Sequence, residues 1–61
     1  MAGTFVLQKS PSGSYFFVLR AGNGETIAQS EMYASKSTAQ NGIASVKENA
    51  PTAPIDDQTG E

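Results

Sequence analysis

Hydrophobic and polar residues alternate along the first third of the chain, which predicts β-strands. Within residues 4–9, Phe5 and Leu7 point to one face of a strand and Val6 points to the other. Residues 14–21 follow the same period of two. One face carries Tyr15, Phe17 and Leu19, and the other carries Phe16, Val18 and Arg20.

Two glycine-containing segments separate three such strands. Residues 10–13 combine Pro and Gly and predict a tight turn. Asn23 and Gly24 predict a type I′ hairpin turn, because both residues accept the left-handed conformation that this turn requires. The third strand, residues 25–30, has Ile27 as its apolar anchor, on the face that Phe5 shares. Residues 4–30 are therefore expected to form an antiparallel meander.

A helical period replaces the alternation over residues 37–50. One face of this helix carries Ala39, Ile43, Val46 and Ala50. Ser37 and Gln40 have the spacing of a capping box, and Pro51 prevents the helix from continuing. Gly42 costs a helix about 1 kcal/mol relative to Ala. Its presence indicates a close approach of the helix to the sheet, where a Cβ would obstruct the packing.

The C-terminal segment has a single large apolar residue, Ile55, within residues 52–57, and residues 58–61 read as a polar tail. An isolated apolar anchor in an extended segment fits a short edge strand. A frayed tail fits the same residues equally well, so the sequence leaves both interpretations open.

Three ordered strings of the chain resemble the YegP-like family of small bacterial and archaeal proteins, a domain of unknown function also called UPF0339. The strings are Ala21-Gly22-Asn23-Gly24-Glu25, Ser30-Glu31-x-Tyr33-x-Ser35-Lys36 and Gly42-Ile43-x-Ser45-Val46-Lys47-x-Asn49-Ala50. The resemblance extends from Phe5 to about Asp57. Tyr15 stands where the family often has Trp, and Gly22 occupies a position that varies in the family.

The resemblance implies an α+β fold built from one β3-α-β unit, with an antiparallel meander sheet and one helix on one face. In the family two such units form one continuous sheet and exchange their C-terminal strands. Residues 1–61 hold a single unit, so the resemblance implies a strand-exchanged homodimer with residues 52–57 as the exchanged strand. It implies no catalytic residue, because none is established for the family.

The composition also indicates a partner chain. A domain of 61 residues buries only about 60% of the surface of its unfolded chain and is marginally stable on its own. The chain has no Cys and no His, which excludes a disulfide and, in practice, a structural zinc site. A second copy of the chain is the remaining means of stabilisation.

The charge pattern weakens the case for nucleic-acid binding. The net charge is −2. Residues 1–47 carry four cations and two carboxylates, whereas residues 48–61 carry four carboxylates and no cation. Four scattered cations do not form a stripe that neutralises phosphates. Phe16 with Arg20 remains the only aromatic platform for a single strand on the helix-free face.

Catalytic, cofactor and metal sites are all disfavoured. Ser35-Lys36 and Ser45-x-Lys47 are the only Ser–Lys neighbours, and separations of one or two residues do not face each other on a helix. Gly22-x-Gly24 leads into a strand rather than a helix, so it is not a phosphate loop. The acidic tail lacks the ligand spacing of a calcium loop. We therefore expect no enzyme activity, no cofactor and no metal.

The expected function is a non-enzymatic structural or interaction module that acts as a homodimer. The residues expected to contact the second copy or another partner are Val6, Phe16, Val18 and Ile55. The alternative is a weak nucleic-acid or peptide binder that uses the helix-free sheet face, and a small-molecule site at the dimer seam is a third interpretation. No apolar run approaches the roughly 20 residues of a membrane span, and residues 1–4 lack the features of a signal peptide. A cytoplasmic location is the expectation.

Overall fold

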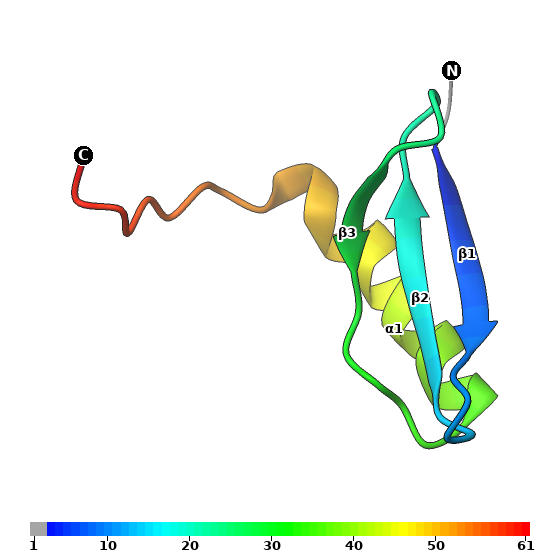
Figure 1. Ribbon diagram of the computed structural model, residues 1–61. Coiled ribbons are helices and arrows are strands. Elements are labelled where there is room, and N and C mark those ends of the chain that lie inside the picture. Colours follow the sequence, from blue (N-terminus) through cyan, green and yellow to red (C-terminus); the bar gives the residue numbers. More distant parts are fainter. Residues whose placement is uncertain (1–2) are drawn as a thin grey trace.

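A computed structural model describes residues 3–61 of the chain as a three-stranded sheet and one helix (Figure 1). The prediction that residues 1–4 are not a signal peptide rests in part on Met1 and Ala2, which lie outside the described residues. The elements, in chain order, are β1 (Thr4–Lys9), β2 (Tyr15–Arg20), β3 (Thr26–Gln29), α1 (Lys36–Asn49) and a short 3-10 turn, η1 (Ala50–Thr52).

The strands form an antiparallel meander in the order β1-β2-β3, with α1 on one face of the sheet (Figure 1). Val6 lies opposite Val18, and Leu7 opposite Phe17, in the register of β1 and β2. Within the described residues α1 packs against β1 and β2 but not against β3. The predicted α+β architecture is therefore confirmed, and the helix covers only part of its face of the sheet.

Both hairpins turn through three-residue loops. In the second hairpin, the Ala21 N–H donates to the Glu25 carbonyl at 2.8 Å, and the Gly24 N–H donates to the Ala21 carbonyl at 2.9 Å. Gly24 has a φ of 89°, whereas no residue other than glycine has a positive φ within the described residues. The predicted type I′ turn is therefore wrong, because such a turn needs positive φ at both central residues.

The predicted face of Ile27 is also wrong. Ala28 pairs with Leu19, whose face is covered by the helix, and Thr26 pairs with Arg20 across an irregularity in the ladder. Ile27 is 61% exposed. Adjacent residues of a strand point to opposite faces, so the register that places Ala28 beside Leu19 turns Ile27 away from the helix.

The helix begins earlier than the capping pattern predicts. Ser35 is the N-cap, with φ −137° and ψ 157°, and its hydroxyl accepts a hydrogen bond from the Thr38 N–H at 3.2 Å. Ser37 lies inside the first turn, so its predicted role as the cap is wrong. An N-cap residue needs an extended backbone, and Ser35 has it because the chain has just left the sheet.

The core centres on Phe17, which is 6% exposed. Its ring packs edge-on against Phe5, with centroids 5.9 Å apart, and stacks with Tyr33 at 6.2 Å. Tyr33 is held there because its backbone N–H and carbonyl both bond to Tyr15 at the start of β2, at 2.7 and 2.8 Å. Ala39, with no exposed surface, is the only buried residue of α1.

Gly42 confirms the predicted close approach. A Cβ at this position would lie 2.7 Å from the Tyr33 Oη atom and 3.1 Å from the Phe17 Cε2 atom. Hydrogen is therefore the only side chain that fits without displacement of these two rings. The glycine lets the helix settle directly on the Phe17–Tyr33 pair.

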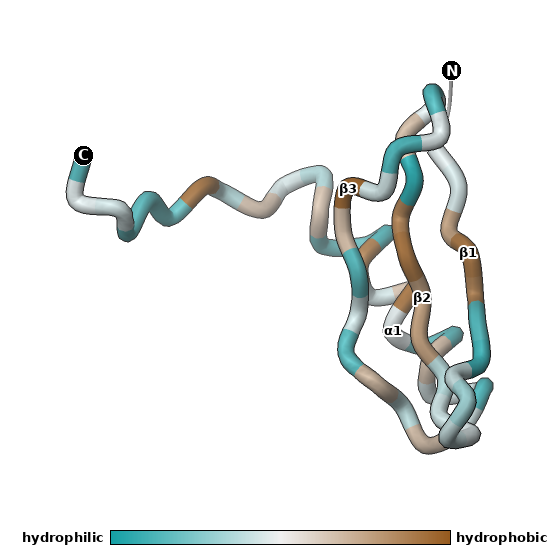
Figure 2. Tube along the Cα trace, viewed as in Figure 1, coloured by the Kyte–Doolittle hydropathy of each residue, from teal (hydrophilic) through white to brown (hydrophobic). Residues whose placement is uncertain are grey.

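The C-terminal segment leaves the body after η1 and extends away past the edge formed by β3 (Figure 1). Residues 53–61 form no strand or helix and are all exposed. Figure 2 shows one strongly hydrophobic stretch in this otherwise neutral or hydrophilic tail, in agreement with the position of Ile55.

Candidate functional site

An open groove lies on the helix side of the sheet where α1 leaves β3 uncovered. The groove has a volume of about 290 Å³ and is lined largely by apolar side chains. Its principal walls are Phe5, Leu19, Ala28, Tyr33 and Val46. Apolar side chains that gather in an open groove are typical of an interaction site.

The opposite, helix-free face carries three of the four predicted contact residues. Val18 is only 5% exposed, although no helix covers it. Its neighbours in the ladder are Val6 on β1 and Gln29 on β3, and their side chains share its face. Val6 and Phe16 are half-buried. The structure thus brings Val6, Phe16 and Val18 together, but it buries the central one within this chain.

Ile55, the fourth predicted contact residue, is far from the other three along the chain. It is 95% exposed. Two residues later, the Asp57 carboxylate accepts hydrogen bonds from the Thr59 hydroxyl at 2.7 Å and from the Thr59 N–H at 3.0 Å. These two bonds, the hydroxyl first, lower the pKa of Asp57 below its usual value. The tail therefore presents the apolar Ile55 side chain two residues before the hydrogen-bonded Asp57 carboxylate.

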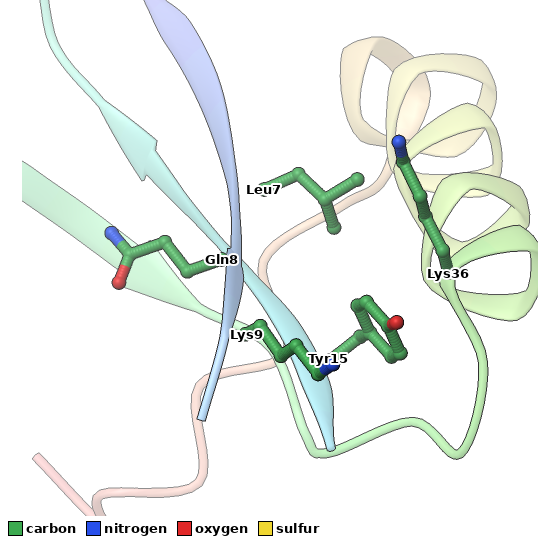
Figure 3. Close-up of a pocket in the computed structure, with 5 residues that line it drawn as sticks. All are labelled: Leu7, Gln8, Lys9, Tyr15 and Lys36. Carbon is green, nitrogen blue, oxygen red and sulfur yellow. The ribbon is translucent and has the colours of Figure 1, made fainter. Parts of the chain in front are cut away.

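A second groove, of about 440 Å³, lies between β1, the start of β2 and the start of α1. Figure 3 shows Leu7 and Tyr15 on the side of the sheet that faces Lys36, whereas Gln8 points to the other side. The Lys9 ammonium lies 5.6 Å from the centre of the Tyr15 ring. Sequence reasoning missed this groove, because only the β1–β2 register places Lys9 beside Tyr15.

The serines beside lysines have structural roles. The Ser35 hydroxyl caps α1, and the Asn49 side-chain amide donates to the Ser45 carbonyl at 2.8 Å and to its hydroxyl at 3.3 Å. In residues 3–61 no three His, Cys, Asp or Glu side chains gather as they would around a metal ion. Over the same residues, no helix has the length and hydrophobicity to cross a membrane.

Comparison with known proteins places the chain among relatives of unknown function. Residues 10–57 match a family model described as "Domain of unknown function (DUF1508)". The UPF0339 protein YegP of Escherichia coli (strain K12) is 59% identical over 51 residues, which are 84% of this chain and 46% of that protein. A UPF0339 protein of Shewanella oneidensis is 53% identical over 51 residues, with the same two coverages.

This chain spans about half the length of the curated relatives it matches. A solved structure gives the comparison at equal length. The solution structure of a protein from Haloferax volcanii is 38% identical, with a TM-score of 0.81, and the match covers 90% of this chain and 93% of that one. The β3-α arrangement thus also occurs in a chain of this size.

Proposed function

The chain belongs to the DUF1508 family, which confirms the resemblance to YegP-like proteins, and on that premise we propose that it is a non-enzymatic structural or interaction module that acts as a homodimer. Residues 52–57 of each copy add as a strand to the sheet of the other. The two units then share one continuous sheet, and the chain itself is the principal partner.

The observation that carries this proposal is the incomplete core of the single unit. Of the hydrophobic residues in the described part of the chain, only three are buried, namely Phe17, Val18 and Ala39. The groove beside β3 is lined by Leu19, Ala28 and Val46, none of which is fully buried. A small domain is marginal even when its core is complete, so a second copy that covers this groove supplies burial that the single unit lacks.

The tail supports the exchange of strands. It extends away from its own body (Figure 1), and Ile55 is 95% exposed there. Complete burial of an Ile side chain stabilises a protein by about 1.5–3 kcal/mol. In a symmetric dimer, burial of Ile55 from each of the two tails against the other copy would contribute this stabilisation twice.

The lengths of the relatives support a pair of units. YegP of Escherichia coli is about twice as long as this chain, of which 84% aligns to one part of that protein. Two units in one chain and two copies of a one-unit chain are equivalent ways of making a pair.

Substitution of Ile55 tests this function. Because Ile55 is almost wholly exposed, Ile55→Asp is not expected to unfold a single unit. The dimer dissociation constant, measured by sedimentation equilibrium, should rise at least tenfold, since burial of one Ile per tail is lost. Ile55→Val is the matched control and should keep the constant within about threefold. Wild-type protein that sediments as a monomer at 100 μM would refute the proposal.

The alternative function is a weak nucleic-acid or peptide binder that uses the helix-free face. Phe16, which is half-buried on that face, is the side chain that favours it. Phe16→Asp should abolish capture of a ligand while the far-ultraviolet circular dichroism stays unchanged. If Phe16→Asp unfolds the protein instead, Phe16 belongs to the core and this alternative fails. The cytoplasmic location stays a prediction.

A further inference from the structure

We propose that the groove between β1, the start of β2 and the start of α1 binds a small organic dianion, which has a flat apolar body between two carboxylates. Lys9 and Lys36 bind the two carboxylates, and Leu7 and Tyr15 contact the body of the ligand. These four side chains belong to a single copy of the chain. The inference therefore goes beyond the proposed function and does not depend on the homodimer.

The register of β1 and β2 forms the floor of this groove. Lys9 lies directly opposite Tyr15 in the antiparallel pair, so the two side chains share one face of the sheet. Leu7 is two residues before Lys9 on the same strand and points to that face as well. Leu7 and Tyr15 are only half-buried. The floor therefore offers an aliphatic side chain and an aromatic ring that a ligand can reach.

The start of α1 forms the opposite wall of the groove. Lys36 is the first residue of the helix, and it is exposed together with the two residues that follow it. Ala39 is the buried residue of the helix. The first turn of α1 therefore leaves an open space of about 440 Å³ over the sheet. Ligand pockets of proteins have volumes of about 300–1,000 Å³, so this space is large enough for a small organic molecule.

The charges of this groove favour an anion. Within the described residues, the charged side chains that line it are Lys9 and Lys36, and no carboxylate lines it. Glu31, in the loop between β3 and α1, lines the other groove instead. The groove therefore carries a charge of +2 in a chain whose net charge is −2. An anion that enters the groove meets two cations and no acidic side chain that competes for them.

The placement of the two ammonium groups indicates a ligand with two separate acidic groups. Figure 3 shows the Lys36 ammonium across from Leu7 and pointing away from Tyr15, whereas the Lys9 side chain runs toward Tyr15. The Lys9 ammonium lies 5.6 Å from the centre of the Tyr15 ring. Each ammonium is a compact point charge, which one carboxylate neutralises. A flat apolar body between the two carboxylates would pack against the Tyr15 ring, since aromatic rings stack favourably.

Three small acids test the inference on the full-length protein. Terephthalate has a benzene ring between two carboxylates, benzoate has the ring with one carboxylate, and succinate has two carboxylates without a ring. In NMR titrations with terephthalate, the amide signals that shift should be those of Leu7, Lys9, Tyr15 and Lys36. The dissociation constant of terephthalate should be at least about threefold lower than the constants of benzoate and succinate, because each of these two acids lacks one of the contacts.

Lysine variants identify the charges that bind the ligand. Lys9→Gln and Lys36→Gln should each raise the dissociation constant of terephthalate about threefold to fivefold. Lys47→Gln is the matched control, because it removes the same charge at the other end of α1, where the Lys47 ammonium lies 5.7 Å from the centre of the Phe5 ring. It should keep the constant within about 1.5-fold of the wild type. All three lysines are exposed, and circular dichroism checks that each variant is folded.

Three results would overturn the inference. The first is a titration with terephthalate that shifts no amide signal of the groove. The second is an equal dissociation constant for the three acids, which would show that neither the ring nor the second carboxylate contributes. The third is an equal loss of affinity in Lys47→Gln, which would show that carboxylates bind to any exposed lysine. A wild-type chain that sediments as a monomer refutes the proposed homodimer and leaves this inference intact.

Discussion

The substitution Gly42→Ala tests how closely α1 approaches the sheet. The change adds a single methyl group at the point where the helix rests on the aromatic pair. That methyl carbon would lie 2.7 Å from the Tyr33 Oη atom and 3.1 Å from both the Tyr33 Cζ and Phe17 Cε2 atoms. The first distance is well inside van der Waals contact, so either the Tyr33 ring or the helix must move.

Two opposing terms set the size of the effect. Replacement of Gly by Ala inside a helix stabilises it by about 1 kcal/mol. Insertion of a methyl group into a packed site costs about 1–3 kcal/mol. The Tyr33 ring cannot simply swing aside, because it stacks on Phe17 and its backbone is bonded to β2. We therefore expect Gly42→Ala to lower the free energy of unfolding by about 1 kcal/mol.

Urea denaturation at one fixed protein concentration measures this change, since the stability of a dimer depends on concentration. Ala44→Gly, at an exposed position of the same helix, is the control for propensity and should cost about 1 kcal/mol. Tyr33→Phe removes the atom of the shortest contact. In the Tyr33→Phe background, Gly42→Ala should be neutral to within about 0.5 kcal/mol.

The opposite sign would refute the reasoning. If Gly42→Ala raises the free energy of unfolding by about 1 kcal/mol, as propensity alone predicts, then the helix does not lie close enough to the sheet to exclude a Cβ. An equal loss in the presence and absence of the Tyr33 hydroxyl would show that this hydroxyl is not the obstacle.

Two further predictions concern local hydrogen bonds. Ser35→Ala should lower the free energy of unfolding by about 1 kcal/mol through loss of the N-cap. Ser37→Ala, the control, should change it by less than about 0.5 kcal/mol. Thermal denaturation of both variants measures these changes, and equal losses in the two variants would contradict the assignment of Ser35 as the cap. The bonds from Thr59 favour the ionised form of Asp57, so this turn is stable above the usual pKa of Asp and is lost as the pH falls through the lowered pKa. An NMR pH titration followed at the amide of residue 59 should therefore have its midpoint below the usual pKa of Asp. Thr59→Ala removes the hydroxyl that donates to Asp57 and should raise this midpoint. An unchanged midpoint in Thr59→Ala would show that the hydroxyl does not lower the pKa of Asp57.

The sequence was sufficient for the three strands, the helix and the role of Gly42, but not for the C-terminal strand predicted at residues 52–57, where the structure has none. Alternation and turn residues located the strands, because each rests on local stereochemistry. The register of β3 was not predictable in this way. The face of Ile27 depends on which residue of β3 pairs with Leu19, and a three-residue loop in place of the expected two-residue turn changes that pairing.

The surfaces were predictable only in part. Alternation correctly grouped Val6, Phe16 and Val18 on one face, but the burial of Val18 comes from neighbours on both sides in the sheet. The groove beside Lys9 was missed for a similar reason. Lys9 and Lys36 are far apart in the sequence, and both line this groove only because the start of α1 lies against β1.

The solution mass tests the central claim most directly, on the full chain and on a chain that ends at Ala50. Sedimentation equilibrium at 100 μM should give a dimer for the full chain. The shortened chain, which lacks the segment to be exchanged, should be monomeric or unfolded. A full chain that sediments as a monomer would contradict the account, and so would a shortened chain that dimerises as tightly as the full one.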